Sequence, residues 1–244
     1  MIKTLVFVHG WASSPDVWQK QEGCFSPSYE VILPDIGAAR DIEQAANVVA
    51  DSVKDEKDYV LIGWSLGWLA ILELLKSFEV KPSGLVSVNS TAKFVDDGYL
   101  GTGPTKTHLA KMMRDCKRDP KRVLEEFCAS AFADVSREAL AGLDLCFSGD
   151  ATRVSASSSF DYSSLLDGLE MLKMCDYRAY LQRIDIPTLL IAGALDPICP
   201  KEAAIYMQQH IRGSRLRIMD CRHAPFLARA EEFNTIIDSF VRGL

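Results

Sequence analysis

The chain has 244 residues, of which 48% are hydrophobic and 25% are charged, and its formal net charge is −6. This length suits one α/β core with one inserted segment, and a chain this apolar buries enough surface to fold rather than stay disordered. The negative net charge argues against a protein that binds nucleic acid with its whole surface.

Six short apolar segments, rich in Val, Ile and Leu, predict strands that are buried on both faces of a mostly parallel sheet. These segments are Thr4–Val8, Glu30–Leu33, Tyr59–Gly63, Leu85–Asn89, Thr188–Ala192 and Leu216–Met219. Apolar residues at helical spacing predict helices between and after them, at Ile42–Val53, Trp68–Phe78 and Ala230–Val241. The alternation of strands and helices is typical of α/β architecture.

The stretch from residue 91 to residue 183 interrupts this alternation. It contains no convincing strand, and its helical stretches are rich in Lys, Arg, Ala and Leu. We therefore predict a helical cap, or lid, at residues 91–183. The cap would be inserted between two halves of one core, residues 1–90 and 184–244.

The sequence Gly63-Trp64-Ser65-Leu66-Gly67 has the Gly-x-Ser-x-Gly pattern of a nucleophile elbow. It follows the apolar segment Tyr59–Ile62 and precedes a helix that starts near Trp68, which is the context that this motif requires. Glycine flanks the serine because the turn from strand to helix is too tight for neighbouring Cβ atoms. We expect Ser65 to be a nucleophile with a helix N-terminus beside its oxyanion. A structural turn with an unreactive serine is the alternative.

A serine nucleophile needs a base, and in this type of fold the acid and then the histidine follow the serine along the chain. Of the four histidines, His223 follows the last predicted strand, where an α/β sheet places its chemistry. His108 and His210 are expected at the surface. The acid should follow the preceding strand, which favours Asp196 as the residue that orients the base. Asp220 also ends a strand and is the rival acid.

An oxyanion hole needs two backbone N–H donors. Leu66, directly after the nucleophile, is expected to supply one of them. The loop His9-Gly10-Trp11 follows the first strand, and the N–H of Trp11 is the candidate for the second. The indole of Trp11 should also form a wall of the acyl pocket, although plain packing is the alternative. The ring of His9 is expected to fix this loop by hydrogen bonds.

Several segments together resemble one known family. They are His9-Gly10-Trp11 with the elbow, Gly168–Lys173 followed by Asp176 and Arg178, Leu195-Asp196 followed by Pro200, and His223–Phe226 followed by Glu232-Phe233. In these segments the chain resembles the pimeloyl-[acyl-carrier protein] methyl ester carboxylesterases of biotin synthesis, which are α/β-hydrolases. The resemblance covers both core halves well and the cap loosely.

This resemblance implies the α/β-hydrolase fold and a serine esterase that needs no cofactor and no metal. It implies a Ser65–Asp196–His223 triad, with oxyanion donors at Trp11 and Leu66. It also implies that the substrate is a methyl-esterified acyl chain carried by acyl-carrier protein.

The predicted cap carries a run of basic residues opposed only by Asp115 and Asp119. The run consists of Lys106, Lys111, Arg114, Lys117, Arg118, Lys121 and Arg122. Spacings of three or four predict that Lys111, Arg114, Arg118 and Arg122 share one helix face. A positive patch on an acidic protein suits an acidic partner such as the carrier, and Arg114, Arg118 and Arg122 are the candidate docking residues. A solvated helix face is the commoner meaning of a charge run.

Three phenylalanines of the cap, Phe127, Phe132 and Phe147, are candidates to line an acyl channel. Phe127 is the one that we assign to substrate binding. Packing between cap and core is the alternative for each of them.

Two other functions stay open. The first is a general short-chain carboxylesterase or thioesterase, because a fold does not fix its substrate. The second is a ligand-binding protein that kept the fold and lost turnover. The intact serine, aspartate and histidine argue against this second function.

The cysteines and the apolar runs bear on location. The seven cysteines are odd in number and include no Cys-x-x-Cys pair, which argues against a disulfide framework and a cysteine zinc site. The N-terminal apolar run is too short for a signal peptide. The longest uncharged run, Tyr59–Leu72, is shorter than the roughly 20 residues of a membrane span. We therefore expect a soluble, cytoplasmic protein.

Overall fold

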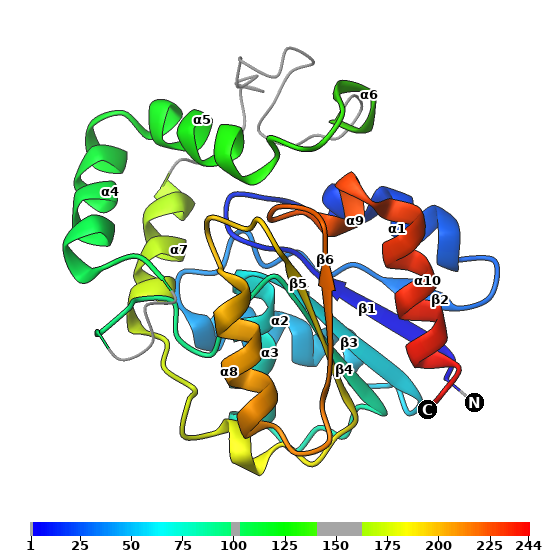
Figure 1. Cartoon of the computed structure of the whole chain (residues 1–244). Coiled ribbons are helices and arrows are strands. Elements are labelled where there is room, and N and C mark those ends of the chain that lie inside the picture. Colours follow the sequence, from blue (N-terminus) through cyan, green and yellow to red (C-terminus); the bar gives the residue numbers. More distant parts are fainter. Residues whose placement is uncertain (1, 99–102, 141–162) are drawn as a thin grey trace.

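The computed structural model describes residues 2–98, 103–140 and 163–244. Within these residues, six parallel strands form one sheet in the order β2-β1-β3-β4-β5-β6 (Figure 1). The strands are β1 (Thr4–Val8), β2 (Glu30–Ile32), β3 (Tyr59–Trp64), β4 (Gly84–Val88), β5 (Thr188–Gly193) and β6 (Arg215–Met219). The predicted α/β architecture is confirmed, and each predicted strand is present with its ends shifted by at most one residue.

The burial of the strands explains why they could be predicted from the sequence. Every residue of the four inner strands β1, β3, β4 and β5 is buried, as continuous apolar runs require. The outer strands β2 and β6 are partly exposed, and Arg215 and Arg217 place positive charge on the β6 edge. Charged side chains on an edge strand oppose pairing with another chain.

Helices cover both faces of the sheet (Figure 1). The helices α1 (Gln19–Phe25), which follows the 3-10 turn Pro15–Trp18, and α10 (Ala230–Val241) lie on one face, and the short α9 (Pro225–Ala228) precedes α10. The other face carries α2 (Ile42–Val53), α3 (Leu66–Ser77) and α8 (Lys201–His210). None of the described helices is both long enough and apolar enough to cross a bilayer.

The segment between β4 and β5 is helical throughout its regular elements. It contains α4 (Lys106–Arg118), α5 (Pro120–Ala131), α6 (Arg137–Leu140), α7 (Ser163–Met174) and the 3-10 turn Leu181–Arg183, and no strand among its described residues. In Figure 1, α4 and α5 stand apart from the sheet, with α7 between α4 and the core. We propose that residues 91–183 form a cap on a core made of residues 1–90 and 184–244.

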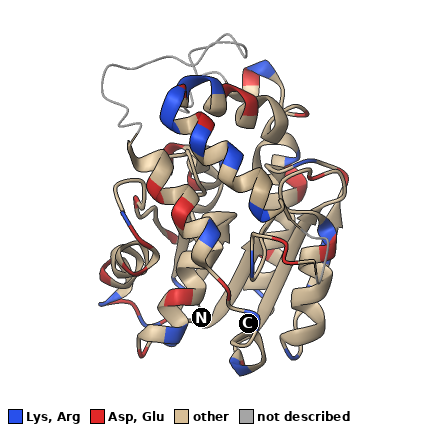
Figure 2. Ribbon diagram, turned by 90° about the vertical axis from the view of Figure 1, so that its left-hand side faces the viewer, with Lys and Arg blue, Asp and Glu red and all other residues tan. Residues whose placement is uncertain are grey.

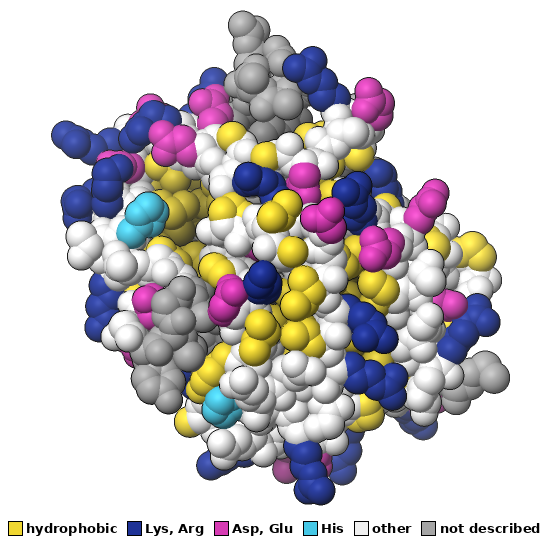
Figure 3. Space-filling model, viewed as in Figure 1, with side chains coloured by type: hydrophobic (Ala, Val, Ile, Leu, Met, Phe, Trp, Pro, Cys, Tyr) yellow, Lys and Arg dark blue, Asp and Glu magenta, His cyan; other side chains and the backbone are white. Residues whose placement is uncertain are grey.

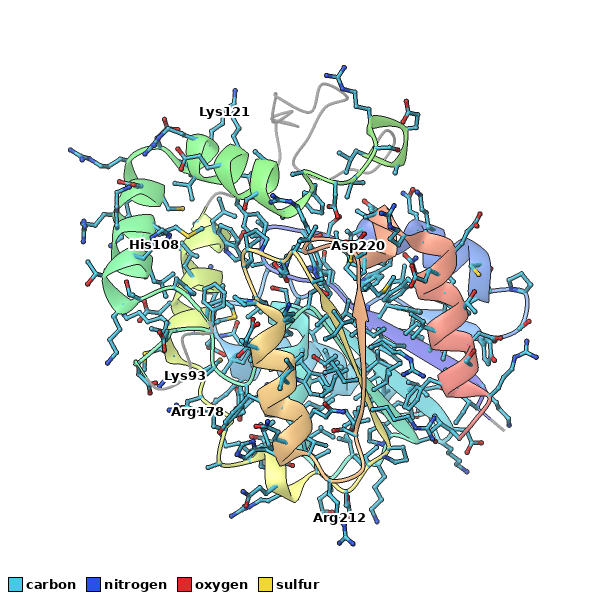
Figure 4. The ribbon with its side chains drawn as sticks, in the orientation of Figure 1. Lys93, His108, Lys121, Arg178, Arg212 and Asp220 are labelled. Atoms are coloured by element: carbon cyan, nitrogen blue, oxygen red, sulfur yellow. The ribbon has the colours of Figure 1, made fainter. Side chains whose placement is uncertain are left out.

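The chain enters and leaves this insertion side by side. Lys93 forms an isolated antiparallel bridge with Asp176, and its Nζ lies 2.7 Å from Asp97 and 3.2 Å from Asp176. Arg178 contacts the same two carboxylates at 3.0 and 2.7 Å (Figure 4). Two cations and two carboxylates therefore hold the segment that enters the insertion against the segment that leaves it.

A buried carboxylate fastens the exit of the insertion to the core. Glu73 lies on α3 and accepts hydrogen bonds from Tyr177 Oη at 2.7 Å, from Ser77 Oγ and from Lys76 Nζ. Burial raises the pKa of Glu73, but its hydrogen bonds with Ser77, Tyr177 and Lys76 outweigh burial and hold the pKa below the ordinary 4.5. The ionised form of Glu73 is therefore the form that stabilises the fold.

The lowered pKa of Glu73 predicts a pH-dependent stability. A depressed carboxyl pKa contributes stability above the unfolded value, and this contribution is lost as the pH falls through the folded value. We expect Glu73→Gln to lower the free energy of unfolding by about 1–3 kcal/mol at neutral pH, because three donors lose a charged acceptor. The difference from wild type should shrink below pH 4.5.

Thermal denaturation from about pH 7 to about pH 3 measures both effects. Glu79→Gln is the matched control, since it removes an exposed carboxylate just beyond the same helix. Equal pH dependence in wild type, control and Glu73→Gln would contradict the assigned role of Glu73.

Candidate active site

The turn from β3 into α3 has the geometry of a nucleophile elbow. Ser65 has φ 54° and ψ −118°, a conformation that non-glycine residues rarely adopt. A Cβ on Gly67 would overlap the carbonyl oxygens of Val8 and His9, and a Cβ on Gly63 would lie 2.7 Å from the backbone of Trp68. Both flanking glycines are therefore required by close backbone contacts.

Asp196 follows β5 and His223 follows β6, and the two side chains meet at the carboxyl ends of these strands. His223 is completely buried, and its Nδ1 lies 2.7 Å from Asp196 Oδ2. The other carboxylate oxygen, Oδ1, accepts hydrogen bonds from the N–H groups of Ile198 (2.8 Å) and Cys199 (3.2 Å). His223 Nε2 has no hydrogen-bond partner among the described residues, which leaves this nitrogen available to a reacting group.

The rival acid Asp220 and the two histidines expected at the surface make no hydrogen bond with the Asp196–His223 pair among the described residues. Asp220 is exposed, and among the described residues no hydrogen bond joins it to His223. His108 is exposed on α4, and His210 ends α8 with its Nδ1 2.8 Å from Tyr206 O. The geometry therefore pairs His223 with Asp196.

Trp64 was assigned no role from the sequence, yet it joins the elbow to the base loop. Its indole Nε1 donates to the main-chain oxygen of His223 at 2.8 Å. Its ring also packs against the rings of His223 and Phe226, with centroids 5.3 and 5.0 Å apart. The only sequence signal for this role was a large aromatic residue beside the serine.

The loop after β1 places Trp11 beside the elbow. The indole Nε1 donates to Leu165 O at 2.9 Å, and the ring meets Phe127 edge-on at 4.8 Å. A Cβ on Gly168 would overlap the indole, so α7 packs directly on Trp11. Leu66 begins α3, and its N–H is one of the donors that a helix start leaves without an intrahelical partner. We propose that the backbone N–H groups of Trp11 and Leu66 form the oxyanion hole.

His9 fixes this loop as expected from the sequence. Its Nδ1 lies 3.0 Å from Gly10 O, and its Nε2 lies 3.0 Å from the N–H of Ile36. The buried ring therefore holds the β1 loop against the segment that follows β2.

A cavity of about 530 Å³ reaches Ser65 from the surface. Its apolar lining comes from the β1 loop and the insertion, at Trp11, Phe94, Met112, Phe127, Leu169 and Leu172. Exposed residues of α4, among them His108 and Lys111, also line it, and Figure 3 shows a hollow with hydrophobic side chains beside the histidine of this helix. The volume and the apolar lining suit a small-molecule chain.

The three phenylalanines proposed for the channel have different positions. Phe127 lines the cavity. Phe132 is buried and lies 6.2 Å from Trp64, measured between ring centroids, and it is not among the residues that line the cavity. Phe147 lies outside the described residues.

The basic run does not form a single helix face, so that prediction is wrong. The helix α4 ends at Arg118, and α5 begins at Pro120, because proline has no N–H with which to continue a helix. Arg122 lies on α5, where it pairs with Glu126 at 2.8 Å and approaches Asp115 of α4 at 3.6 Å. Arg114 and Arg118 are exposed on α4, with no ion pair among the described residues. Figure 2 shows acidic residues interspersed with the basic ones on these helices.

The pairing of Asp196 with His223 predicts unequal effects of two isosteric substitutions. Asp196→Asn should lower kcat by roughly four orders of magnitude, because an amide favours the wrong tautomer of the imidazole. Asp220→Asn, the matched control, should leave kcat close to wild type. Initial rates on a small aryl ester measure both. A larger loss from Asp220→Asn would transfer the acid role to Asp220.

Known proteins match nearly the full length of the chain. Residues 5–236 match the model of the alpha/beta hydrolase family. The pimeloyl-[acyl-carrier protein] methyl ester esterase of Nitrosomonas europaea is 32% identical, over 96% of this chain and 94% of the relative. The enzyme of the same name from Aromatoleum aromaticum is 31% identical, over 98% of each chain. Among solved structures, an esterase from Exiguobacterium antarcticum matches with a TM-score of 0.85 at 24% identity, over 98% of this chain and 92% of that one. The chain therefore belongs to the alpha/beta hydrolase family and, within it, to the pimeloyl-[acyl-carrier protein] methyl ester esterases.

Proposed function

We propose that this enzyme hydrolyses the methyl ester of pimeloyl-[acyl-carrier protein], releasing methanol and pimeloyl-[acyl-carrier protein] for biotin synthesis. The observation that carries the proposal is the buried Asp196–His223 pair, together with an elbow serine that lines an apolar cavity. The names of the relatives supply the substrate class.

The arrangement accounts for acyl transfer to water in two steps. In the first step, Ser65 Oγ attacks the ester carbonyl while His223 Nε2 takes the hydroxyl proton. The N–H groups of Trp11 and Leu66 donate to the oxyanion, and methanol leaves with the proton from His223. In the second step, His223 Nε2 takes a proton from water, which attacks the acyl-Ser65 carbonyl. His223 then gives that proton to Ser65 Oγ, which leaves and frees the carboxylate product. Asp196 holds the imidazole in the required tautomer throughout.

The low exposure of Ser65 and the apolar lining of the cavity support cleavage of the ester rather than the thioester. Ser65 is 7% exposed and lines the cavity together with the apolar side chains. Each methylene buried along this lining contributes about 0.8 kcal/mol to binding. The far end of a carrier-bound chain therefore reaches Ser65, while the thioester stays near the entrance with the carrier outside.

The position of α4 supports docking of the carrier beside the entrance. His108 and Lys111 of this helix line the cavity, while Arg114 and Arg118 of the same helix are exposed. An acidic partner that contacts Arg114 and Arg118 would thus stand next to the opening. Arg122 contributes less, because Glu126 and Asp115 already offset its charge.

Because Ser65 is the proposed nucleophile, its substitution should cause the largest loss of kcat of any single change. Ser65→Ala should lower kcat on a carrier-bound methyl pimelate by about 10⁶-fold, because nucleophile and base act as a unit. Mass spectrometry of the carrier should show loss of the methyl group with the acyl chain retained. A fluorophosphonate probe should label wild type and the control Ser26→Ala, which changes an exposed serine, but not Ser65→Ala.

Two outcomes would contradict this proposal. More than about a tenth of wild-type activity in Ser65→Ala would remove Ser65 from the chemistry. Fast turnover of small esters with no turnover of the carrier-bound ester would make the enzyme a general carboxylesterase.

If the carrier docks against Arg114 and Arg118, reversing their charge should affect the carrier-bound substrate and not a small one. Arg114→Glu with Arg118→Glu should lower kcat/KM for the carrier-bound ester by about tenfold or more, and added salt should lower the wild-type value in the same direction. Activity on a small free ester should hardly change. Arg122→Glu should have a smaller effect than the pair.

The matched control is Arg212→Glu, which reverses an exposed charge at the opposite end of the molecule from α5 (Figure 4). If the double variant and this control handled the carrier-bound ester alike, α4 would present only a solvated face.

A further inference from the structure

Asn89 directly follows β4 in a conformation that side chains rarely adopt. Its φ is 42°, in the left-handed region that Asn tolerates better than most residues, and its exposed fraction is 1%. Its backbone N–H donates to Ile191 O of β5 at 2.8 Å. Burying a polar side chain and holding its backbone at a positive φ both cost free energy. The contacts of Asn89 must offset this cost.

The side-chain amide of Asn89 uses all of its strong donors and its acceptor. Nδ2 donates to Asp196 Oδ2 at 2.8 Å and to Arg222 O at 2.7 Å. Oδ1 accepts a hydrogen bond from the N–H of Gly193 at 3.0 Å. One amide thus connects the end of β5, the acid, and the peptide that precedes the base.

We propose that Asn89 is the positioning residue of the triad. Its amide holds Asp196 Oδ2 and the main chain before His223 in fixed positions relative to each other. This inference rests on the proposed roles of Asp196 and His223. It does not depend on which ester is the substrate. Asn89 acts through these residues and does not touch the reacting atoms.

The hydrogen bonds of Asp196 show what Asn89 adds. Oδ1 is held by the loop of Asp196 itself, through Ile198 and Cys199. Oδ2, the oxygen that faces the imidazole, has Asn89 as its donor besides His223. Without Asn89, the loop would constrain one carboxylate oxygen while the other could rotate away from His223.

The second donor of Asn89 holds the base from its own side. Arg222 O belongs to the peptide bond that leads into His223, and Asn89 Nδ2 lies 2.7 Å from it. A Cβ on Gly193 would overlap Arg222 O and would lie 2.9 Å from Asn89 Nδ2. The absence of a side chain at residue 193 therefore gives the amide room to bridge acid and base.

The chemistry of these contacts is specific to an amide. An aspartate at residue 89 would keep the acceptor for Gly193 but place an oxygen against both Asp196 Oδ2 and Arg222 O. An apolar side chain would leave both of these buried acceptors without their donor, which is costly. Asn supplies two donors and one acceptor in one plane.

The experiment compares Asn89→Gly, Asn89→Asp and the matched control Asn234→Ala on a small aryl ester. Glycine removes the amide without strain, because it accepts a positive φ. We expect Asn89→Gly to lower kcat by about 10–100-fold with KM changed by less than about threefold, as other orienting contacts of catalytic groups do. Asn234→Ala removes an amide–amide hydrogen bond of 3.0 Å with Gln21 and should leave kcat unchanged.

Asn89→Asp adds a pH readout that a purely structural role would not move. A second carboxylate beside Asp196 favours the protonated imidazole, so the acidic limb of kcat/KM should shift to higher pH. Among the described residues, Asp196 is the charged side chain that contacts the His223 ring. Burial keeps the neighbouring Cys199 thiol neutral by raising its pKa, and Asp196 adds to this.

The possible outcomes separate this inference from the proposed function. A lower melting temperature with wild-type kcat and an unmoved acidic limb would show that Asn89 only stabilises the fold and would overturn the inference. If Asn89→Gly fails to fold, Asn89→Asp, which retains the acceptor for Gly193, decides through its pH limb. Full activity of Asp196→Asn on the aryl ester would instead refute the triad, and failure on the carrier-bound ester alone would refute only the substrate.

Discussion

The positions of the nucleophile and of both proposed oxyanion donors depend on how closely the start of α3 approaches the end of β1. Gly67 has no room for a Cβ because the carbonyl oxygens of Val8 and His9 lie against it. This contact places Trp11 and Leu66, the two proposed oxyanion donors, beside Ser65. The first nine residues of α3 are buried, and every residue of β3 is buried too, so the surrounding core sustains the strained backbone of the serine.

The parallel sheet then assembles the rest of the site from distant parts of the chain. Because the carboxyl ends of all six strands lie along one edge, residues that follow β3, β5 and β6 meet there. This is why Ser65, Asp196 and His223 could be selected from the sequence before their contacts were known. Each follows an apolar strand within four residues, which is local information, and the fold alone brings the three segments together.

What the sequence could not indicate depends on contacts between distant residues. The partners of Asn89 lie 104, 107 and 133 residues away, and nothing in the sequence around Asn89 distinguishes it from an ordinary turn residue. Trp64 donates to a residue 159 positions further on. The break between α4 and α5 has a local signal, the proline at residue 120, although the regular spacing of the basic residues favours one continuous helix. The pairing of Arg122 with Asp115 follows from that break, since the side chains meet across two helices.

Trp11 couples the position of the insertion to the position of the oxyanion loop, which is the loop His9-Gly10-Trp11 after β1. Its indole is bonded to Leu165 O and pressed against Gly168, both on α7, while its backbone N–H is a proposed donor to the oxyanion. The insertion is in turn fastened to the core through the contacts of Glu73 with the chain that leaves it. A displacement of α7 would therefore move the oxyanion loop as well as the cavity wall. The cavity that holds the acyl chain and the proposed oxyanion hole thus share one residue, Trp11, so substrate fit and catalysis cannot change independently.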